Sequence, residues 1–367
     1  MTHMNTMTMR NVTQFILYWM RSIVDGLINT PDNLDGYLVP LLIGAPGIGK
    51  TAITRIAAKM MDWDLLLIHL GTADGGDVQG LPFPDPENER IAYLMGDQLN
   101  SIFNPPPDRM TLCFFDDVHG ADRHNGVQAG LMQFLHAREL NGRKVPDNVH
   151  FILAANGREH SSGGQGMNGP LKERCLPINC VVDRMEFIED VAEKNMWHPD
   201  IVSYLNTCDH EYISSPTIGQ GEFDRTPNPR GWAHINDAYR MTMPRTPVEK
   251  GDLSDNALLS MRKKMIAAAG GDDLCHNFHC WLEEQKHVDY DIKGIVTQVY
   301  KGKGDKAELP DAEDALWVIG TLLGKSVTKD SYARFRKYVD RMPEHLIQVF
   351  ESVLTTRTGN EDWKAWA

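Results

Sequence analysis

The chain has 367 residues and a formal net charge of -13, and 42% of its residues are hydrophobic. A chain of this length and composition can bury a sizeable core and is long enough for two domains. Its acidic balance argues against a broad nucleic-acid-binding face, although a ring can enclose a basic channel within an acidic exterior. We find no run of about 18 apolar residues, and the N-terminal MTHMNTMTMRN lacks the order of a secretion signal, so we expect no membrane span and a cytoplasmic protein.

The first segments predict a helix, a strand, a glycine loop and a second helix, in that order. Residues 12–29 place apolar side chains at helical spacing, and the PDNLDG that soon follows breaks this pattern. The apolar run YLVPLLIG is typical of a buried parallel strand, and TAITRIAAKMM beyond the loop is rich in helix formers.

Three further apolar runs predict strands, with helical stretches between them: residues 64–70, 111–117 and 150–156. Alternation of strands and helices predicts a parallel sheet covered by helices on both faces, and therefore an α/β fold. The interval 71–107 is rich in Gly, Pro and Asp and is too long for a plain connection. We expect it to be an insertion with a function of its own.

Beyond Met185 the strand pattern stops, and the chain to Ala367 is helical with turns. The boundary between an α/β part and a helical part is therefore expected near Asp183. The expected organisation is an N-terminal helical segment at 1–35, an α/β domain at 36–183, an α-helical domain at 184–284 and a helical C-terminal extension at 285–367.

The stretch GAPGIGKT fits the pattern G-x-x-x-x-G-K-[ST] and lies between a predicted strand and a predicted helix. In such a loop the glycines let backbone N–H groups turn toward nucleotide phosphates, and the following helix adds a favourable dipole. The lysine reaches the outer phosphates and the threonine hydroxyl binds magnesium. The expected nucleotide-binding residues of this loop are Gly44, Ala45, Pro46, Gly47, Ile48, Gly49, Lys50 and Thr51.

A second acidic motif, TLCFFDD, gives an apolar strand that ends in Asp116 and Asp117. We expect Asp116 to hold Mg²⁺ together with Thr51, and Asp117 to orient a water for attack on the γ-phosphate. Two acids at the carboxyl end of a strand lie in the crevice where open α/β sheets bind ligands. An isolated acid pair would more often just end a strand at the surface, but the phosphate loop favours the functional interpretation.

Taken together, these stretches resemble the AAA+ ATPases and, among them, the MoxR-like branch, over about residues 36–243. The run DDVHGADRHNGVQAGLMQFLHARELNGRKV is similar to that branch's order of paired acids, short turn, helix and hairpin. The resemblance implies an AAA+ P-loop core with a parallel sheet between helices, a lid domain at 184–284, and Mg²⁺-dependent hydrolysis of ATP. The extension at 285–367 lies beyond the resemblance, and it either packs on the lid or provides a docking surface.

Three more stretches match segments of the family. HFILAANG resembles the sensor 1 strand, which implies that Asn156 helps Asp117 to position the attacking water, since an amide both donates and accepts. PLKERC resembles the arginine-finger segment, which implies that Arg174 faces a neighbouring subunit's γ-phosphate. TPNPRGWAHINDAYR resembles the sensor 2 helix, which implies that Arg230 reaches the nucleotide of its own subunit, although Arg225 is close by in sequence. The expected catalytic residues are therefore Lys50, Asp117, Asn156 and Arg174.

The resemblance also implies a homo-oligomeric ring of six subunits that remodels a partner protein, often one with a von Willebrand factor A domain. In MoxR-like proteins an insertion at the position of 71–107 projects toward the ring pore. Leu81 and Phe83 are candidates there for contacting a partner, and packing on their own domain is an equally good alternative.

Three alternatives follow from the same sequence. The family usually has glutamate where this chain has Asp117, so the protein could be an ATP-gated assembly factor with very slow hydrolysis. A nucleic-acid motor or loader on the same core is the other ATPase candidate, and the acidic total charge makes nucleic acid an unexpected partner. The run CHNFHC crowds four potential zinc ligands on one helix, where they cannot converge on one tetrahedral ion, and the six cysteines include no CxxC pair, so we expect reduced thiols and no zinc.

Overall fold

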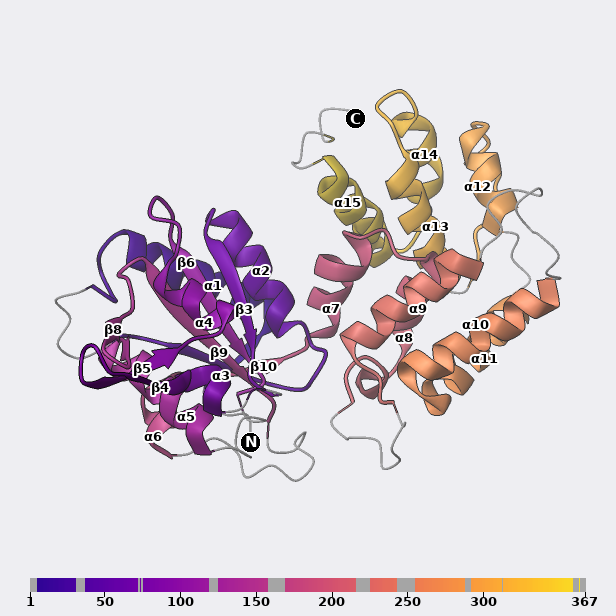
Figure 1. Ribbon diagram of the computed structural model, residues 1–367. Helices are drawn as coiled ribbons and strands as arrows, with labels where there is room; N and C mark the ends of the chain where they lie inside the picture. Colours follow the sequence, from indigo (N-terminus) through magenta and orange to yellow (C-terminus); the bar gives the residue numbers. More distant parts are fainter. Residues whose placement is uncertain are drawn as a thin grey trace. The chain divides into compact units, whose positions relative to one another are not determined.

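The computed structural model of the protein describes residues 5–30, 37–71, 73, 75–118, 125–157, 169–215, 225–242, 255–287, 292–311, 313–358 and 363. It divides into two compact units, one of Met1–Val191 with Asp209–Gly271 and the other of Ala192–Cys208 with Asp272–Ala367. The first unit holds the sheet and the second is built from helices (Figure 1).

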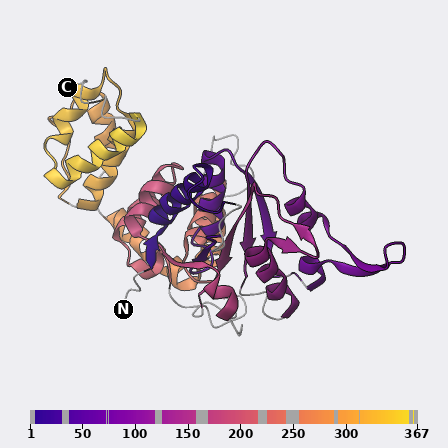
Figure 2. The same ribbon diagram turned by 90° about the vertical axis from the view of Figure 1, so that its left-hand side faces the viewer.

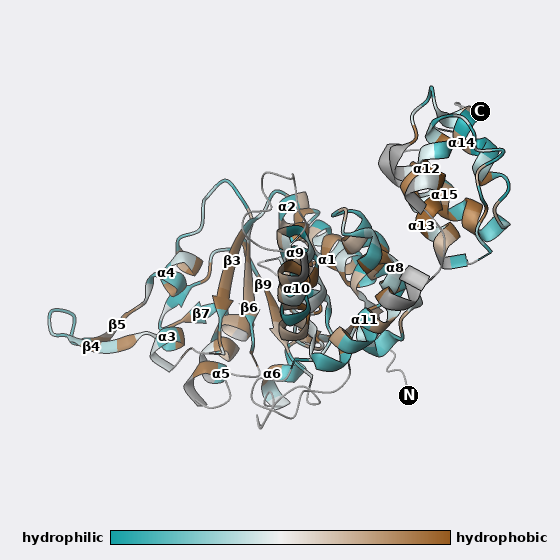
Figure 3. Cartoon of the chain, turned by 90° about the vertical axis from the view of Figure 1, so that its right-hand side faces the viewer, coloured by the Kyte–Doolittle hydropathy of each residue, from teal (hydrophilic) through white to brown (hydrophobic). Residues whose placement is uncertain are grey.

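The first unit is organised around a parallel sheet of six strands in the order β1-β10-β2-β9-β6-β3. The strands are β1 (Thr6–Thr8), β2 (Pro40–Ile43), β3 (Asp64–His69), β6 (Thr111–Asp116), β9 (Val149–Ala155) and β10 (Leu176–Val181). The colouring in Figure 3 shows that β3, β6 and β9 consist largely of hydrophobic residues, as expected for strands inside a sheet covered by helices.

Side chains alternate between the two faces of this sheet. Cys113 and Phe115 of β6 belong to a core with apolar residues of α4 (Asp97–Phe103), α5 (Asn125–Met132) and the π-helix Gln133–Ala137. Leu112 and Phe114 are equally buried and, by the same alternation, point to the opposite face, where α2 (Lys50–Met60) contacts β3 and β6 and α1 (Met9–Val24) packs on α2. The expected α/β fold with a parallel sheet between helices is confirmed.

Two of these strands were absent from the sequence expectations. β10 lies inside the sheet between β1 and β2, and β1 pairs with it in parallel from Thr6 opposite Asn179. The N-terminal segment therefore holds a short strand as well as the expected helix.

The insertion at 71–107 folds into α3 (Gly75–Gln79), an antiparallel hairpin of β4 (Leu81–Asp85) and β5 (Arg90–Leu94), and α4. Asp85 accepts from Arg90 at 3.0 Å and from Asn88 at 2.9 Å, which closes the hairpin at its turn. Figures 2 and 3 show this hairpin extending away from the sheet of its own unit.

A smaller hairpin follows α5 and the π-helix, with strands β7 (Glu139–Leu140) and β8 (Arg143–Lys144). Its turn is Asn141-Gly142, with φ of 52° and 80°, and positive φ at both positions is what a two-residue hairpin turn requires. The hairpin expected in the DDVHGAD run is thus present.

The remaining helices divide between the two units. The first unit contains α6 (Gly169–Glu173), α7 (Arg184–Phe187), the 3-10 helix His210–Tyr212, α9 (Pro229–Thr242) and α10 (Asp255–Gly270), and the π-helix Ile188–Glu193 follows α7. The second unit contains α8 (Pro199–Thr207), α11 (Asp272–His287), α12 (Ile292–Tyr300), α13 (Glu313–Ser326), α14 (Tyr332–Val339) and α15 (Glu344–Thr358). None of the described helices combines the length and apolarity that crossing a membrane demands.

The helices α12 to α15 share a core of their own, which includes Val299, Ile319, Phe335 and Phe350. On α11, the Cys280 sulfur lies 3.6 Å from Nε2 of His276, and no group of three potential ligands that could hold a metal occurs among the described residues.

Candidate functional site

The loop between β2 and α2 has the backbone of a phosphate cradle. Gly47 and Gly49 have φ of 79° and 109°, a left-handed conformation that costs glycine little and other residues more. Gly49 is the N-cap of α2 and supplies no side chain, so the first N–H groups of the helix are left for a ligand. A Cβ on Gly44 would lie 2.7 Å from the carbonyl oxygen of Cys180, so the loop also packs closely on β10.

The Lys50 ammonium lies within this loop, and the residue is only 7% exposed. Its Nζ donates to the carbonyl oxygens of Gly44 at 2.8 Å and Ala45 at 3.0 Å, and to Oδ1 of Asn156 at 3.1 Å. Burial lowers the pKa of Lys50, against an opposing effect of Asp116. A buried ammonium held by neutral oxygens gains from anionic ones, so phosphate oxygens are suitable replacement partners.

Thr51 and Asp116 meet beside the lysine. The Thr51 hydroxyl donates to Oδ2 of Asp116 at 2.9 Å, which brings the start of α2 to the carboxyl end of β6. A hydroxyl and a carboxylate are the hard oxygen donors that Mg²⁺ prefers, so this pair fits the ion. His69, paired with Asp116 across β3 and β6, places Nδ1 4.0 Å from the same Oδ2, a neighbour that the sequence expectations did not include.

Asp117 follows Asp116 in a left-handed conformation, with φ of 56°. Its N–H donates to Oδ1 of Asp116 at 3.0 Å. A Cβ on Gly71 would lie 3.2 Å from Cβ and 3.7 Å from Oδ2 of Asp117, so this carboxylate sits beside the first residue of the insertion.

The start of α9, with Asn228 just before it, reaches the phosphate loop of the same unit. The backbone N–H of Arg230 donates to the carbonyl oxygen of Gly47 at 3.1 Å, while the residue as a whole is exposed. A Cβ on Gly47 would lie 2.6 Å from Oδ1 of Asn228, which also accepts from the N–H of Gly231 at 2.9 Å. The carbonyl of Arg225 instead lies against Gly271. Of the two candidate arginines, Arg230 is the one whose backbone contacts the loop.

Arg174 lies just beyond α6, and its Nη1 donates to the carbonyl oxygen of Pro170 at 2.7 Å. Its Nε is buried without a hydrogen-bond partner among the described residues. Within those residues it forms no hydrogen bond or ion pair with the phosphate loop of its own chain.

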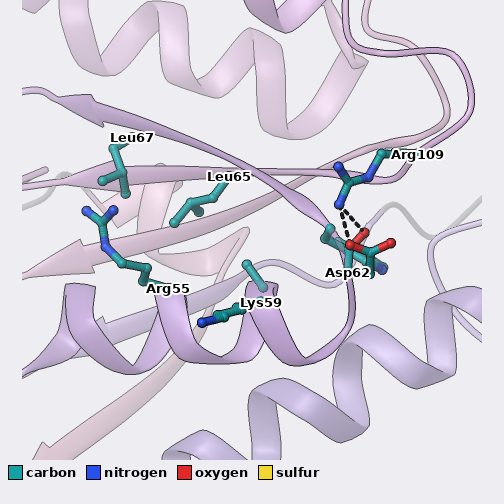
Figure 4. A pocket seen from close by; sticks show the side chains of 8 residues that line it. Arg55, Lys59, Asp62, Leu65, Leu67 and Arg109 are labelled. Atoms are coloured by element: carbon teal, nitrogen blue, oxygen red, sulfur yellow. Dashed lines mark hydrogen bonds and ion pairs between the residues drawn. The ribbon is translucent and has the colours of Figure 1, made fainter.

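A separate surface cavity of about 290 Å³ lies between α2 and β3. Figure 4 shows Arg55 and Lys59 along α2, Leu65 and Leu67 on β3, and Arg109 bonded to Asp62. Asp62 and Arg109 precede β3 and β6, so the cavity is at the amino ends of these strands, whereas Asp116 marks the carboxyl end. It contains none of the residues expected to bind nucleotide.

The family described as "ATPase family associated with various cellular activities (AAA)" matches residues 40–162. This segment carries an AAA ATPase domain. The match includes the phosphate loop, the two acids at the carboxyl end of β6 and Asn156, which confirms the AAA+ P-loop core expected from the sequence.

Comparison with curated proteins found no match. Among solved structures, RuvB of Thermotoga maritima, described as a Holliday junction branch migration motor, is 15% identical, with 91% of this chain and 87% of that chain covered and a TM-score of 0.42. A variant of the same protein is 14% identical, with the same coverage and a TM-score of 0.40. Similarity at this level assigns no function to the present chain.

Proposed function

We propose that the chain is a Mg²⁺-dependent ATPase of the MoxR-like AAA+ branch, which hydrolyses ATP between the subunits of a ring and thereby remodels a partner protein. The observation that carries the proposal is the convergence of Lys50 and Thr51 at the start of α2 with Asp116 and Asn156 at the carboxyl ends of the neighbouring strands β6 and β9. This is the donor set that a nucleoside triphosphate and its magnesium need.

Each residue has a defined part in this proposal. Lys50 exchanges its loop carbonyls for phosphate oxygens, and Thr51 and Asp116 hold Mg²⁺, which would neutralise charge on the phosphates. Asp117 accepts a proton from the attacking water while Asn156 orients that water, which is a task for general-base catalysis worth about 10²- to 10⁴-fold in rate. Arg230 contacts the nucleotide from the lid side.

Arg174 supplies a positive charge to the γ-phosphate of the neighbouring subunit. Its Nη1 bonds to the carbonyl oxygen of Pro170 in the adjoining helix and not to the phosphate loop of its own chain, which fits a role in trans. The proposed assembly is a cytoplasmic ring of six.

The β4–β5 hairpin is the proposed contact with the partner. Leu81 is 62% and Phe83 37% exposed, and their neighbours Ile91 and Leu94 on β5 are 64% and 62% exposed. Apolar side chains on both strands of an extended hairpin favour binding of a protein segment, such as one from a protein with a von Willebrand factor A domain.

The test combines light scattering with phosphate release in the presence of Mg²⁺ and ATP. We expect a nucleotide-dependent ring, and loss of turnover in Lys50→Ala and in Arg174→Ala but not in Lys59→Ala, an exposed lysine of the same helix. Mixing the two inactive variants should restore part of the activity, because some interfaces then combine an intact phosphate loop with an intact Arg174.

The mixture also identifies the alternatives. Two inactive variants that do not complement each other would contradict the shared site. A chain that binds ATP without measurable turnover would support the ATP-gated assembly factor instead.

A further inference from the structure

Basic side chains gather on the second unit, around α14 and the loop that follows α12. The sequence YKGKGDK begins at Tyr300 and contributes Lys301, Lys303 and Lys306. Arg334 and Lys337 lie one turn apart on α14, and Arg341 follows its end. These six exposed residues, Lys301, Lys303, Lys306, Arg334, Lys337 and Arg341, are referred to below as the basic surface.

The loop is held firmly against α14. Gly302 has φ of 76°, and the N–H of Lys303 reaches back to the carbonyl oxygen of Gln298 at 2.9 Å, which ends α12 with a tight turn. Nη1 of Arg341 donates to the carbonyl oxygens of Gly304 at 2.7 Å and Ala307 at 2.8 Å.

Contacts with α14 complete the attachment. A Cβ on Gly302 would lie 3.6 Å from Cδ of Arg334, and one on Gly304 would lie 3.2 Å from Cβ of Tyr338. The Tyr338 hydroxyl donates to the carbonyl oxygen of Glu308 at 2.9 Å. The cations of loop and helix therefore belong to one preformed surface.

The charge of this surface is not cancelled locally. Within the described residues, none of the six cations forms an ion pair with a carboxylate, whereas the neighbouring Arg336 is paired with both Asp340 and Glu351. The exposed acids in the same stretches are Asp305, Glu308 and Asp340, the last of them paired with Arg336, so the six cations outnumber these carboxylates two to one. In a chain with a net charge of -13, this is a local reversal of sign.

Helix stabilisation accounts for only part of the arrangement. Lys301 follows the C-terminus of α12 and Lys337 lies in the last turn of α14, where the helix dipole favours cations. Arg334 lies in the first turn of α14, where the same dipole disfavours a positive charge. Its exposed guanidinium needs a different reason.

We propose that the basic surface binds the phosphate backbone of duplex DNA. Lysine and arginine side chains are the groups that most often contact DNA phosphates, and the six cations of this surface are exposed to such a partner. A protein-docking surface would be expected to have an apolar centre and few lysines. Tyr300, 43% exposed, is the large apolar side chain that adjoins this surface, and its ring packs edge-on against Phe335 at 4.9 Å.

With Tyr300 as one partly exposed ring beside six cations, the surface favours a duplex over a single strand, because single-strand binding relies on a series of exposed aromatic rings on which successive bases stack. The proposal goes beyond ATP hydrolysis and uses none of the residues of the nucleotide site. It also refines the expectation from total charge, since a compact basic surface can bind a polyanion on an otherwise acidic protein.

The test is fluorescence anisotropy of a labelled duplex of random sequence with the full-length chain at several salt concentrations. If the surface contacts about five phosphates, the dissociation constant should rise about 500-fold between 50 and 200 mM salt. The triple variant Lys303→Ala, Arg334→Ala, Lys337→Ala should reduce the slope of log K against log salt by about 2.7. A matched triple variant, Lys59→Ala, Lys144→Ala, Lys264→Ala, should leave the slope unchanged.

Circular dichroism confirms that both variants are folded, and basal ATP turnover without DNA should be equal in both. Equal duplex affinity of the two triple variants would overturn the proposal. So would binding that is as tight to a single strand of the same phosphate count, or to polyglutamate. Because the readout is DNA binding, failure of this proposal and failure of the ATPase proposal are separate results.

Discussion

His150 on β9 creates a pH-dependent weakness in the α/β unit. The side chain is 2% exposed and lies among the rings of Trp19, Tyr37 and Trp63, with ring centroids 5.4 to 6.4 Å away. Neither ring nitrogen has a hydrogen-bond partner among the described residues. Burial, reinforced by the nearby Arg138 guanidinium, lowers the pKa of His150 from 6.5 to about 3.

Proton uptake by the unfolded chain decides in which direction pH changes the free energy of unfolding. Above pH 6.5 the imidazole is neutral in both the folded and the unfolded chain, and the free energy of unfolding carries no penalty from it. As the pH falls from 6.5 toward 3, the unfolded chain takes up a proton that the folded chain does not, so folding is progressively disfavoured. At pH 5 this amounts to a loss of about 2 kcal/mol relative to pH 7.5.

Urea unfolding of the chain and of His150→Phe at pH 7.5 and pH 5.0 measures this loss. Other histidines titrate in both proteins, so the informative quantity is the difference between their losses, expected at about 2 kcal/mol in favour of the variant. Phenylalanine keeps an aromatic ring that cannot take up a proton, and any packing cost of its larger ring is the same at both pH values and cancels in the difference. Equal losses in the two proteins, or a His150 ring proton that titrates near pH 6 in NMR spectra of the folded chain, would refute the reasoning.

Two further predictions concern the nucleotide site. Gly47→Ala would place a Cβ at a φ of 79° and against Asn228, so it should weaken ATP binding about tenfold. The control Gly142→Ala has a φ of 80° and no atom within 4 Å of the added Cβ, so it should lower stability in urea by a similar amount and leave ATP affinity unchanged. Asp117→Asn should lower the rate of phosphate release by about 100-fold or more without unfolding the protein, and unchanged turnover would exclude this residue as the base. Asp117→Glu should lower the free energy of unfolding by about 1 kcal/mol, which thermal melting measures.

The parts of the fold that the sequence predicted are those with a strong local signal. β6 and β9 are continuous apolar runs, and their two-sided burial in the sheet is the physical reason for that pattern. The phosphate loop was predictable because the backbone demands glycine at φ above 0°, and because Lys50 and Thr51 have fixed distances from those glycines along the chain.

β10 could not be predicted in the same way, because proline and asparagine disfavour strands. Proline has no backbone N–H to donate. Pro177 lies opposite Leu41 of β2, and on its other side β1 begins to pair only at Asn179, so no strand there requires an N–H from residue 177. The carbonyl oxygen of Pro177 accepts from the side chain of Asn5 at 3.0 Å. The strand pairs with β1, where Thr6 lies opposite Asn179, and with β2, where Pro40 lies opposite Leu176, and no local pattern contains partners so distant in sequence.

Long-range contact also explains what the sequence left open at the site. Whether Arg225 or Arg230 belongs to the nucleotide depends on the path of the chain before α9, and the hydrogen bond from Arg230 to Gly47 places that path beside the phosphate loop. Asn228 and His69 contact the site through packing of distant segments, and their neighbours in sequence gave no sign of it.

The backbone also gives a physical reason for aspartate at position 117. From the sequence alone, aspartate in place of the family's glutamate predicts a carboxylate that is held farther from the attacking water. In the structure Asp117 has φ of 56°, a conformation in which aspartate and asparagine are enriched over longer side chains. Here Asp117 donates its N–H to Asp116, which in turn accepts from Thr51, so the turn that orders the proposed magnesium ligands is the same turn that favours the shorter acid. A longer side chain at this position would gain reach at the expense of the conformation that holds Asp116 in place.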